Sequence, residues 1–263
     1  ALVTLSEAAA KLPREPEAQF HLGMAHYQNG NETEAANALG RALTLSTSFS
    51  GASEAQRRLQ LLSELSQPVS GENVAKRKAL LEKQNDDPIA LNHLAKIQLN
   101  EGDRTSAKNS LERLVTLTPR SVPTLLTLAR LNAADNPRRS LELARQARTV
   151  DARNPEVAHA VGSYALSCGE YDWALNVLQE QVNAQQHPSA ELLYDFAVAL
   201  HAVGRTDDST AQAKKALNLA QTPAQKSAAD QLLRFLNADT NPPPAMVTEA
   251  TNLLSSSPRF LPA

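Results

Sequence analysis

The sequence predicts an all-α protein in which pairs of antiparallel helices follow one another along the chain. Three observations lead to this fold class: a composition that favours helices, a ladder of glycines and a ladder of prolines. Of the 263 residues, 42% are hydrophobic but only 4% are aromatic, and alanine and leucine are abundant. Alanine and leucine form helices well, whereas the residues typical of strands are sparse here.

Four glycines each end a stretch with the pattern of a helix, at intervals near multiples of about 34–36 residues. They are Gly30, Gly102, Gly169 and Gly204. A glycine at this place lets the chain turn with a positive φ angle, because it has no Cβ atom to clash. One of the two glycines that the period predicts but the sequence lacks would lie near Asn136, where we expect asparagine to take the left-handed conformation instead. The other falls near residues 66–68, where the repeat pattern is degraded.

The prolines mark the expected starts of helices. They are Pro16, Pro88, Pro123, Pro155, Pro188 and Pro223, and from the second onward the gaps are 35, 32, 33 and 35 residues. Proline suits the first helical turn, since its missing N–H would be unpaired there. Asp87, Asn154 and Thr222 precede three of these prolines and are good N-caps. Each period therefore holds a first helix, a turn and a second helix, as in a stacked repeat architecture.

The residues at fixed positions of each period resemble the tetratricopeptide repeat, a helix–turn–helix unit of 34 residues. The unit from Pro16 shows the small and large residues of this signature most completely. These residues are Leu22, Gly23, Gly30, Ala35, Leu39 and Ala42. The units from Pro88, Pro155 and Ala190 repeat the pattern in phase, and two further units match it less well.

The resemblance implies a right-handed α-α superhelix of antiparallel helix pairs over residues 1–240. Its expected parts are the second helix of a truncated repeat at 1–13, repeats at 16–47, 88–120, 121–153, 154–187 and 188–220, a degenerate pair at 50–87, and a capping helix at 223–238. In the degenerate pair we expect helices at about 52–66 and 71–84, without a glycine turn. Residues 241–263 form a proline-rich tail with room for a short helix at 245–254. Because it starts in mid-repeat, we expect the chain to be a fragment of a longer array.

In this family the first helices line a concave groove, so the resemblance also implies which side chains face a partner. They are Phe20, Met24, Tyr27, Gln28, Asn92, Lys96, Leu99, Asn100, Leu126, Arg130, His159, Ser163, Leu166, Glu191, Tyr194, Val198 and His201. Such a mixed surface with a few aromatic anchors suits an extended segment or a helix of another protein. The alternative is that some of these side chains pack against neighbouring helices or against the C-terminal tail.

The sequence does not indicate a catalytic, metal-binding or cofactor-binding site. The single cysteine, Cys168, cannot form an intramolecular disulfide, and the six histidines show no spacing typical of a metal site. No phosphate-binding glycine loop and no catalytic constellation stands out, so we expect no catalytic residues, no metal and no cofactor. No apolar run approaches the ~20 residues of a membrane span, so we expect no membrane insertion by this segment.

Charge is distributed unevenly along the chain, although the formal net charge is only −2. Residues 113–153 carry eight arginines against three acids, a net charge of +5, and residues 154–210 carry eight acids against one arginine, a net charge of −7. This polarity could orient a partner of mixed charge or support self-association; the alternative is that the charges lie on solvated outer faces. The single tryptophan, Trp173, is expected on the outside, either half covered by Tyr171 and the adjacent unit or as part of a second contact surface.

The leading hypothesis is a non-catalytic scaffold that binds a segment of a protein partner in its concave groove. A second hypothesis is the soluble periplasmic arm of a bacterial secretion or exopolysaccharide-export assembly; the excess of arginine over lysine is compatible with a bacterial source. The compartment, cytoplasmic or periplasmic, stays open. Nucleic-acid binding is disfavoured because an acidic block adjoins the basic one and aromatic residues are scarce there.

Overall fold

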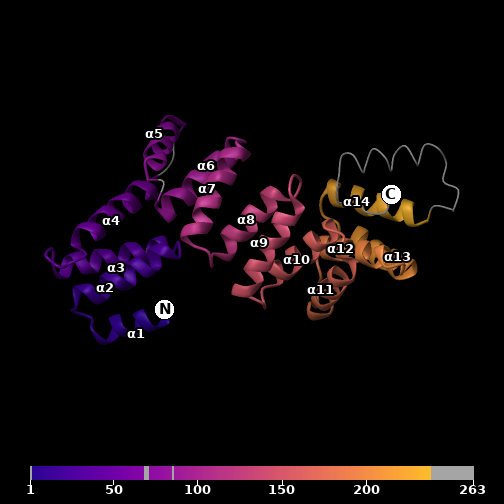
Figure 1. Ribbon diagram of the computed structural model, residues 1–263, viewed down its shortest axis with the longest axis horizontal. Helices are drawn as coiled ribbons and strands as arrows, with labels where there is room; N and C mark the ends of the chain where they lie inside the picture. Colours follow the sequence, from indigo (N-terminus) through magenta and orange to yellow (C-terminus); the bar gives the residue numbers. More distant parts are fainter. Residues whose placement is uncertain (1, 68–70, 85, 238–263) are drawn as a thin grey trace. The chain divides into compact units, whose positions relative to one another are not determined.

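The computed structural model describes residues 2–67, 71–84 and 86–237. Within these residues the chain forms fourteen α-helices and no β-strand (Figure 1). The prediction of an all-α fold built from antiparallel helix pairs is therefore confirmed for the described ranges. The short helix expected at 245–254 lies outside them. The described helices fall into two compact units that divide between Ser121 and Val122.

Unit 1 contains the first seven helices. They are α1 (Leu2–Lys11), α2 (Pro16–Gln28), α3 (Glu32–Leu45), α4 (Ala52–Ser66), α5 (Gly71–Glu82), α6 (Pro88–Asn100) and α7 (Arg104–Leu117). Helices α2 and α3 form one hairpin, and α6 and α7 form another. Helix α1 packs on α2, α4 packs on α3, and α5 packs on α6. The two helices of the degenerate segment thus each pack against a neighbouring hairpin.

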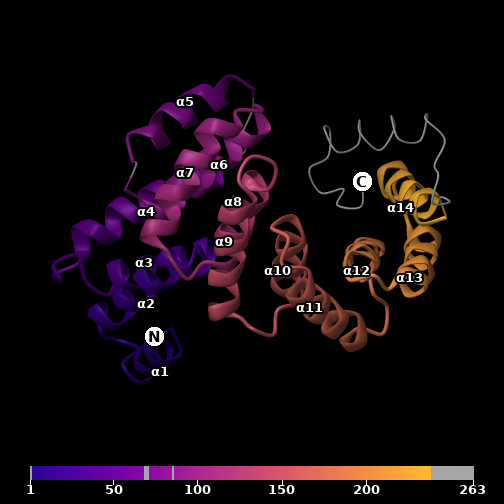
Figure 2. The same ribbon diagram turned by 45° about the vertical axis from the view of Figure 1, so that its right-hand side comes forward.

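Unit 2 contains seven further helices. They are α8 (Val122–Asn132), α9 (Pro137–Val150), α10 (Pro155–Ser167), α11 (Tyr171–Ala184), α12 (Ala190–Ala202), α13 (Thr206–Leu219) and α14 (Pro223–Leu236). Each of α9 to α14 packs on the helix before it (Figure 2). In addition α8 contacts α10, α10 contacts α12, and α12 contacts α14. The first helices of successive hairpins therefore lie next to one another and form a continuous face.

The glycine turns are confirmed, and they connect the two helices of four hairpins. Gly30, Gly102, Gly169 and Gly204 have φ angles of 74°, 79°, 78° and 82°. The expectation for Asn136 is wrong, since its φ is −146° and its side chain accepts a hydrogen bond from the Arg139 N–H as the N-cap of α9. No non-glycine residue in the described part has a positive φ. The turn of this hairpin, residues 133–136, is one residue longer than the three-residue turns that contain the glycines, and it has no left-handed residue.

The predicted N-caps are also confirmed. Asp87 accepts hydrogen bonds of 2.9 Å from the N–H groups of Ile89 and Ala90. Asn154 caps α10 in the same way, and Thr222 forms a capping box at α14. Pro188 is an exception among the prolines, because α12 begins only at Ala190, with Ser189 as its cap.

Close contact within two hairpins depends on glycines in the middle of first helices. A Cβ atom added to Gly23 would lie 2.8 Å from Leu39 Cγ, and one added to Gly162 would lie 2.6 Å from Leu178 Cγ. Both leucines are fully buried. Glycine at these positions therefore lets a leucine of the second helix pack directly against the backbone of the first.

A buried polar cluster connects α2 and α4 to the start of α6, across the degenerate segment. The Tyr27 hydroxyl donates a hydrogen bond of 2.7 Å to the Asp87 carboxylate, which also pairs with the Arg58 guanidinium. The Arg58 guanidinium carbon lies 5.0 Å from the centre of the Tyr27 ring. Burial raises the pKa of Tyr27, so the hydroxyl remains a donor at neutral pH. The cluster holds together helices that a glycine turn does not join.

Backbone carbonyl groups at the C-terminal end of α4 accept hydrogen bonds from a side chain of α5. The Arg77 guanidinium donates to the backbone carbonyls of Glu64, Leu65 and Gln67, at 3.0, 3.4 and 2.7 Å. These carbonyls belong to the last turn of α4 and the residue that follows it. Because terminal helix carbonyls lack partners within the helix, one arginine here replaces the cap that a glycine would allow.

Replacing Gly23 with alanine should destabilise the protein by about 1–2 kcal/mol, because overpacking against Leu39 outweighs the gain in helix propensity. The matched control is Gly40→Ala in the same hairpin. A Cβ atom at Gly40 meets nothing within 4 Å, so this change should stabilise by about 0.5–1 kcal/mol. Urea unfolding followed by circular dichroism measures both, and effects of the same sign would contradict the close-contact explanation.

Replacing Tyr27 with phenylalanine should lower the free energy of unfolding by about 2 kcal/mol, since it removes a hydrogen bond to a buried carboxylate. Asp87 is only 3% exposed, so water cannot replace the lost donor. Tyr171→Phe, at the partly exposed start of α11, is the control and should change stability little. A loss at Tyr27 no larger than that of the control would show that the cluster does not stabilise unit 1.

Candidate partner-binding surface

A pocket of about 320 Å³ opens on the first-helix face of unit 2. Its walls come from α10, α12 and α14, with one residue from α13. We call it the α12 pocket, and it is lined by His159, Ser163, Leu166, Ser167, Ala190, Glu191, Tyr194, Asp195, Val198, Ala216, Ala224, Gln225, Ala228 and Ala229. Six of these residues belong to the predicted partner-binding set: His159, Ser163, Leu166, Glu191, Tyr194 and Val198. The fold thus brings together side chains from two first helices that are about one repeat apart in the sequence.

The α12 pocket combines an apolar floor with polar side chains that are held by hydrogen bonds. Leu166 and Val198 are buried beneath it and, with the alanines of α13 and α14, present small apolar surface. The His159 Nε2 atom lies 3.0 Å from a carboxylate oxygen of Asp195. Gln225 donates a hydrogen bond of 3.2 Å to Glu191. The polar groups are therefore positioned before any partner arrives, which lowers the cost of ordering them on binding.

Tyr194 is the aromatic residue of this pocket. Burial, with a further contribution from the negative charge of Asp195, raises the pKa of Tyr194 to about 12. The phenol is therefore neutral at physiological pH. A half-buried tyrosine offers a large apolar ring together with one hydroxyl, which is the combination typical of anchor residues at protein interfaces.

A second pocket of about 310 Å³ lies between α8 and α10. Leu126 and Arg130 from the predicted set line it, together with Glu156 and Tyr164 of α10. The first-helix face of unit 2 is thus hollowed at two places, and both hollows contain predicted residues.

His201 lies farther along α12, outside both pockets. Its ring meets the Phe235 ring edge-on, with the ring centres 5.4 Å apart. Burial lowers the pKa of His201, and no hydrogen-bond partner for its Nδ1 atom occurs within residues 2–67, 71–84 and 86–237. His201 therefore packs against the capping helix, which is the alternative considered for the groove residues.

The predicted residues of unit 1 divide into packed and exposed side chains. Phe20 and Met24 are half-buried against the unit 1 core, and the Phe20 ring centre lies 5.6 Å from that of Phe49. Tyr27 is only 1% exposed and takes part in the buried polar cluster, so it offers a partner almost no surface. The remaining predicted side chains of unit 1 are at least partly exposed: Gln28, Asn92, Lys96, Leu99 and Asn100.

Sequence reasoning did not include the residues that the capping helix contributes to the pocket, namely Ala224, Gln225, Ala228 and Ala229. It also did not include Asp195, which follows Tyr194 on α12. A signal for α14 was available, because Pro223 continues the proline ladder and so predicts another first helix in phase. A capping helix in that register completes the wall beside the last repeat.

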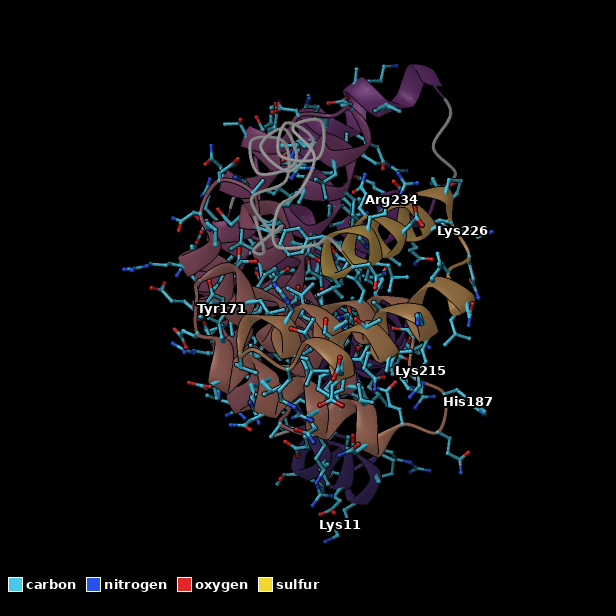
Figure 3. All side chains as sticks on the ribbon, turned by 90° about the vertical axis from the view of Figure 1, so that its right-hand side faces the viewer. Lys11, Tyr171, His187, Lys215, Lys226 and Arg234 are labelled. Atoms are coloured by element: carbon cyan, nitrogen blue, oxygen red, sulfur yellow. The ribbon has the colours of Figure 1, made fainter. Side chains whose placement is uncertain are left out.

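On the outside of unit 2, Trp173 is half-buried beneath an arginine of the preceding hairpin. The Arg145 guanidinium carbon lies 4.5 Å from the centre of the tryptophan rings, and Arg145 also pairs with Glu170 at 2.5 Å. Nearby, burial raises the pKa of the Cys168 thiol, which keeps it protonated and weakly reactive. Tyr171, labelled in Figure 3, is partly exposed at the start of α11.

Two further observations concern metal binding and membrane insertion. Across the described ranges, no cluster of histidine, cysteine, aspartate and glutamate could hold a metal ion. None of the helices in those ranges is both long enough and apolar enough to span a bilayer.

The raised pKa of Tyr194 predicts a specific loss of stability in alkali. Its folded pKa of about 12 exceeds the ordinary value of 10.0, so its contribution is complete below pH 10 and is lost as the pH rises through 12. Tyr194→Phe should remove this part of the decline, while the part due to Tyr27 remains in both proteins. Urea unfolding at about pH 9 and about pH 11 tests this, and parallel declines in the two proteins would contradict it.

Comparisons with known families and structures agree with this geometry. Two family models described as tetratricopeptide repeat match the chain, one over residues 17–45 and one over residues 89–121. No curated protein sequence matches the chain at a significant level.

Among solved structures, MamA from Desulfovibrio magneticus RS-1 is similar with a TM-score of 0.51 and 16% identity, over 64% of this chain and 93% of that one. The TPR domain of P58(IPK) is similar with a TM-score of 0.51 and 15% identity, over 97% of this chain and 68% of that one. At these identities the likeness concerns the fold alone. Together with the repeated hairpins and their glycine turns, the two family matches show that the chain contains tetratricopeptide repeats.

Proposed function

We propose that this protein is a non-catalytic scaffold that binds a segment of a partner protein on the first-helix face of unit 2. The observation that carries the proposal is the α12 pocket, in which α10 and α12 bring together six predicted contact residues, one of them the half-buried Tyr194, beside a wall from α14. A volume of about 320 Å³ accommodates one or two side chains of a polypeptide.

The form of the surface favours a polypeptide over a small substrate. The α12 pocket and the pocket between α8 and α10 share helix α10, which supplies residues to both. An extended segment or a helix running across α8, α10 and α12 could place one side chain in each pocket. Two anchors on one segment would act together, because the second binds at the effective concentration set by the first.

The chemistry of the side chains also supports binding without catalysis. Tyr194 remains a neutral phenol and Cys168 a protonated thiol, so neither is activated as a nucleophile. The histidine and the carboxylate of the pocket are engaged with each other at 3.0 Å. These groups serve to orient and recognise a partner rather than to transform it.

A displayed library of random peptides of about 12 residues, long enough to cover several helices, tests the proposal. The complete chain should select peptides whose binding weakens at least tenfold on Tyr194→Ala, a loss of about 1.4 kcal/mol or more for an interface anchor. The matched control is Tyr171→Ala, since Tyr171 is a tyrosine of the same unit that lies outside both pockets.

Selected peptides that bind the Tyr194→Ala and Tyr171→Ala proteins equally well would place the binding surface elsewhere. Failure to select any peptide that depends on Tyr194 would reject the proposed function. Circular dichroism and thermal unfolding of both variants would confirm that they are folded.

A further inference from the structure

The α12 pocket carries two carboxylates that have no lysine or arginine partner within the described residues. Glu191 and Asp195 stand four residues apart on α12, and both line the pocket. Glu191 accepts a hydrogen bond from the neutral amide of Gln225, and Asp195 is bonded to His159. Within the part of the chain that the structure describes, neither carboxylate pairs with a lysine or an arginine.

Three other acidic side chains of the C-terminal half of the chain pair with arginines. Glu170 pairs with Arg145, Asp208 with Arg205, and Asp230 with Arg234. Arg205 is the only arginine or lysine between residues 154 and 210, and its pairing with Asp208 at 2.7 Å occupies it at the start of α13. The cation nearest in sequence is thus engaged elsewhere, and the partners of the two pocket carboxylates are Gln225 and His159.

The lysines that follow in the sequence do not line the pocket either. Lys214 and Lys215 lie on the exposed side of α13, and Lys226 lies at the exposed start of α14. Figure 3 shows Lys226 at the outer edge of the molecule. Among the residues that the structure describes, no lysine or arginine lines the pocket, and His159, which pairs with Asp195, is its lining residue that can carry a positive charge.

The floor beside these carboxylates is apolar. Leu166 and Val198 are 4% and 3% exposed, and Ala216 and Ala229 complete the surface between the helices. Carboxylates beside a low-dielectric wall attract a cation more strongly than carboxylates surrounded by water. The site thus offers a place for an apolar side chain and, next to it, a place for a positive charge.

We propose that the α12 pocket selects partner segments in which an arginine or a lysine stands next to an apolar residue, with the cation at Glu191 and Asp195 and the apolar side chain on the floor. The inference rests on the proposed function and specifies the chemistry of its partner. Arginine suits the site better than lysine, because its planar guanidinium can donate two parallel hydrogen bonds to a carboxylate. The neutral Tyr194 ring can cover the aliphatic part of the basic side chain.

The test uses the peptides selected from the random library by the complete chain. Tyr194-dependent peptides should be enriched in a basic residue next to an apolar one, and Glu191→Gln with Asp195→Asn should weaken their binding roughly tenfold per carboxylate removed. Asparagine at 195 keeps an acceptor for His159. The matched control is Glu180→Gln with Asp207→Asn, which changes the net charge equally at exposed positions outside the pocket. Raising the salt concentration should weaken binding to the unchanged chain more than to the pocket variant.

Three results would overturn the inference. Selected peptides that need Tyr194 but carry no cation, and that bind the pocket variant normally, would leave the proposed function standing and reject the basic partner. Equal losses in the pocket and control variants would show a general charge effect. Self-association of the chain that disappears in the pocket variant, without enrichment of basic peptides, would assign the pocket to a second copy instead.

Discussion

The close approach of two helices within each hairpin is the constraint on which the rest of this structure depends. Gly23 and Gly162 have no side chain, and Leu39 and Leu178 of the facing helices occupy the space where a Cβ atom would lie. A single hairpin of this kind buries only part of its apolar surface, so hairpins must stack. Stacking aligns α8, α10, α12 and α14 of unit 2, and the spaces between these first helices become the two pockets.

The polar contacts divide between those that stabilise the fold and those that shape the binding surface. The Tyr27–Asp87–Arg58 cluster is buried and joins helices around the degenerate segment, where no glycine turn is present. The His159–Asp195 and Gln225–Glu191 contacts lie at a pocket and connect neighbouring first helices. Both groups link elements that are far apart in sequence. Only the second group faces a space that a partner can enter.

Much of the fold was predictable because glycine and proline act locally. The turns at Gly30, Gly102, Gly169 and Gly204 follow from the freedom of glycine to adopt a positive φ, and the caps at Asp87, Asn154 and Thr222 follow from the first turn of a helix. The inward position of Tyr27 was not predictable, since it depends on Arg58 and Asp87, which lie 31 and 60 residues away. The expectation for Asn136 was wrong because this residue is the N-cap of α9 and not the left-handed residue of the turn. The pocket wall from α14 required tertiary packing that no single repeat encodes.

Hydrogen–deuterium exchange of the complete chain, with and without a selected peptide, tests most directly whether the first helices of unit 2 receive a polypeptide. Binding should slow exchange in α10, α12 and the first turns of α14, because closing the pocket suppresses the local opening that exchange requires. Exchange in the exposed turns of α11 and α13 should be unaffected. Protection that appears in α11 and α13 while α10 and α12 exchange as before would contradict a partner bound on the first-helix face.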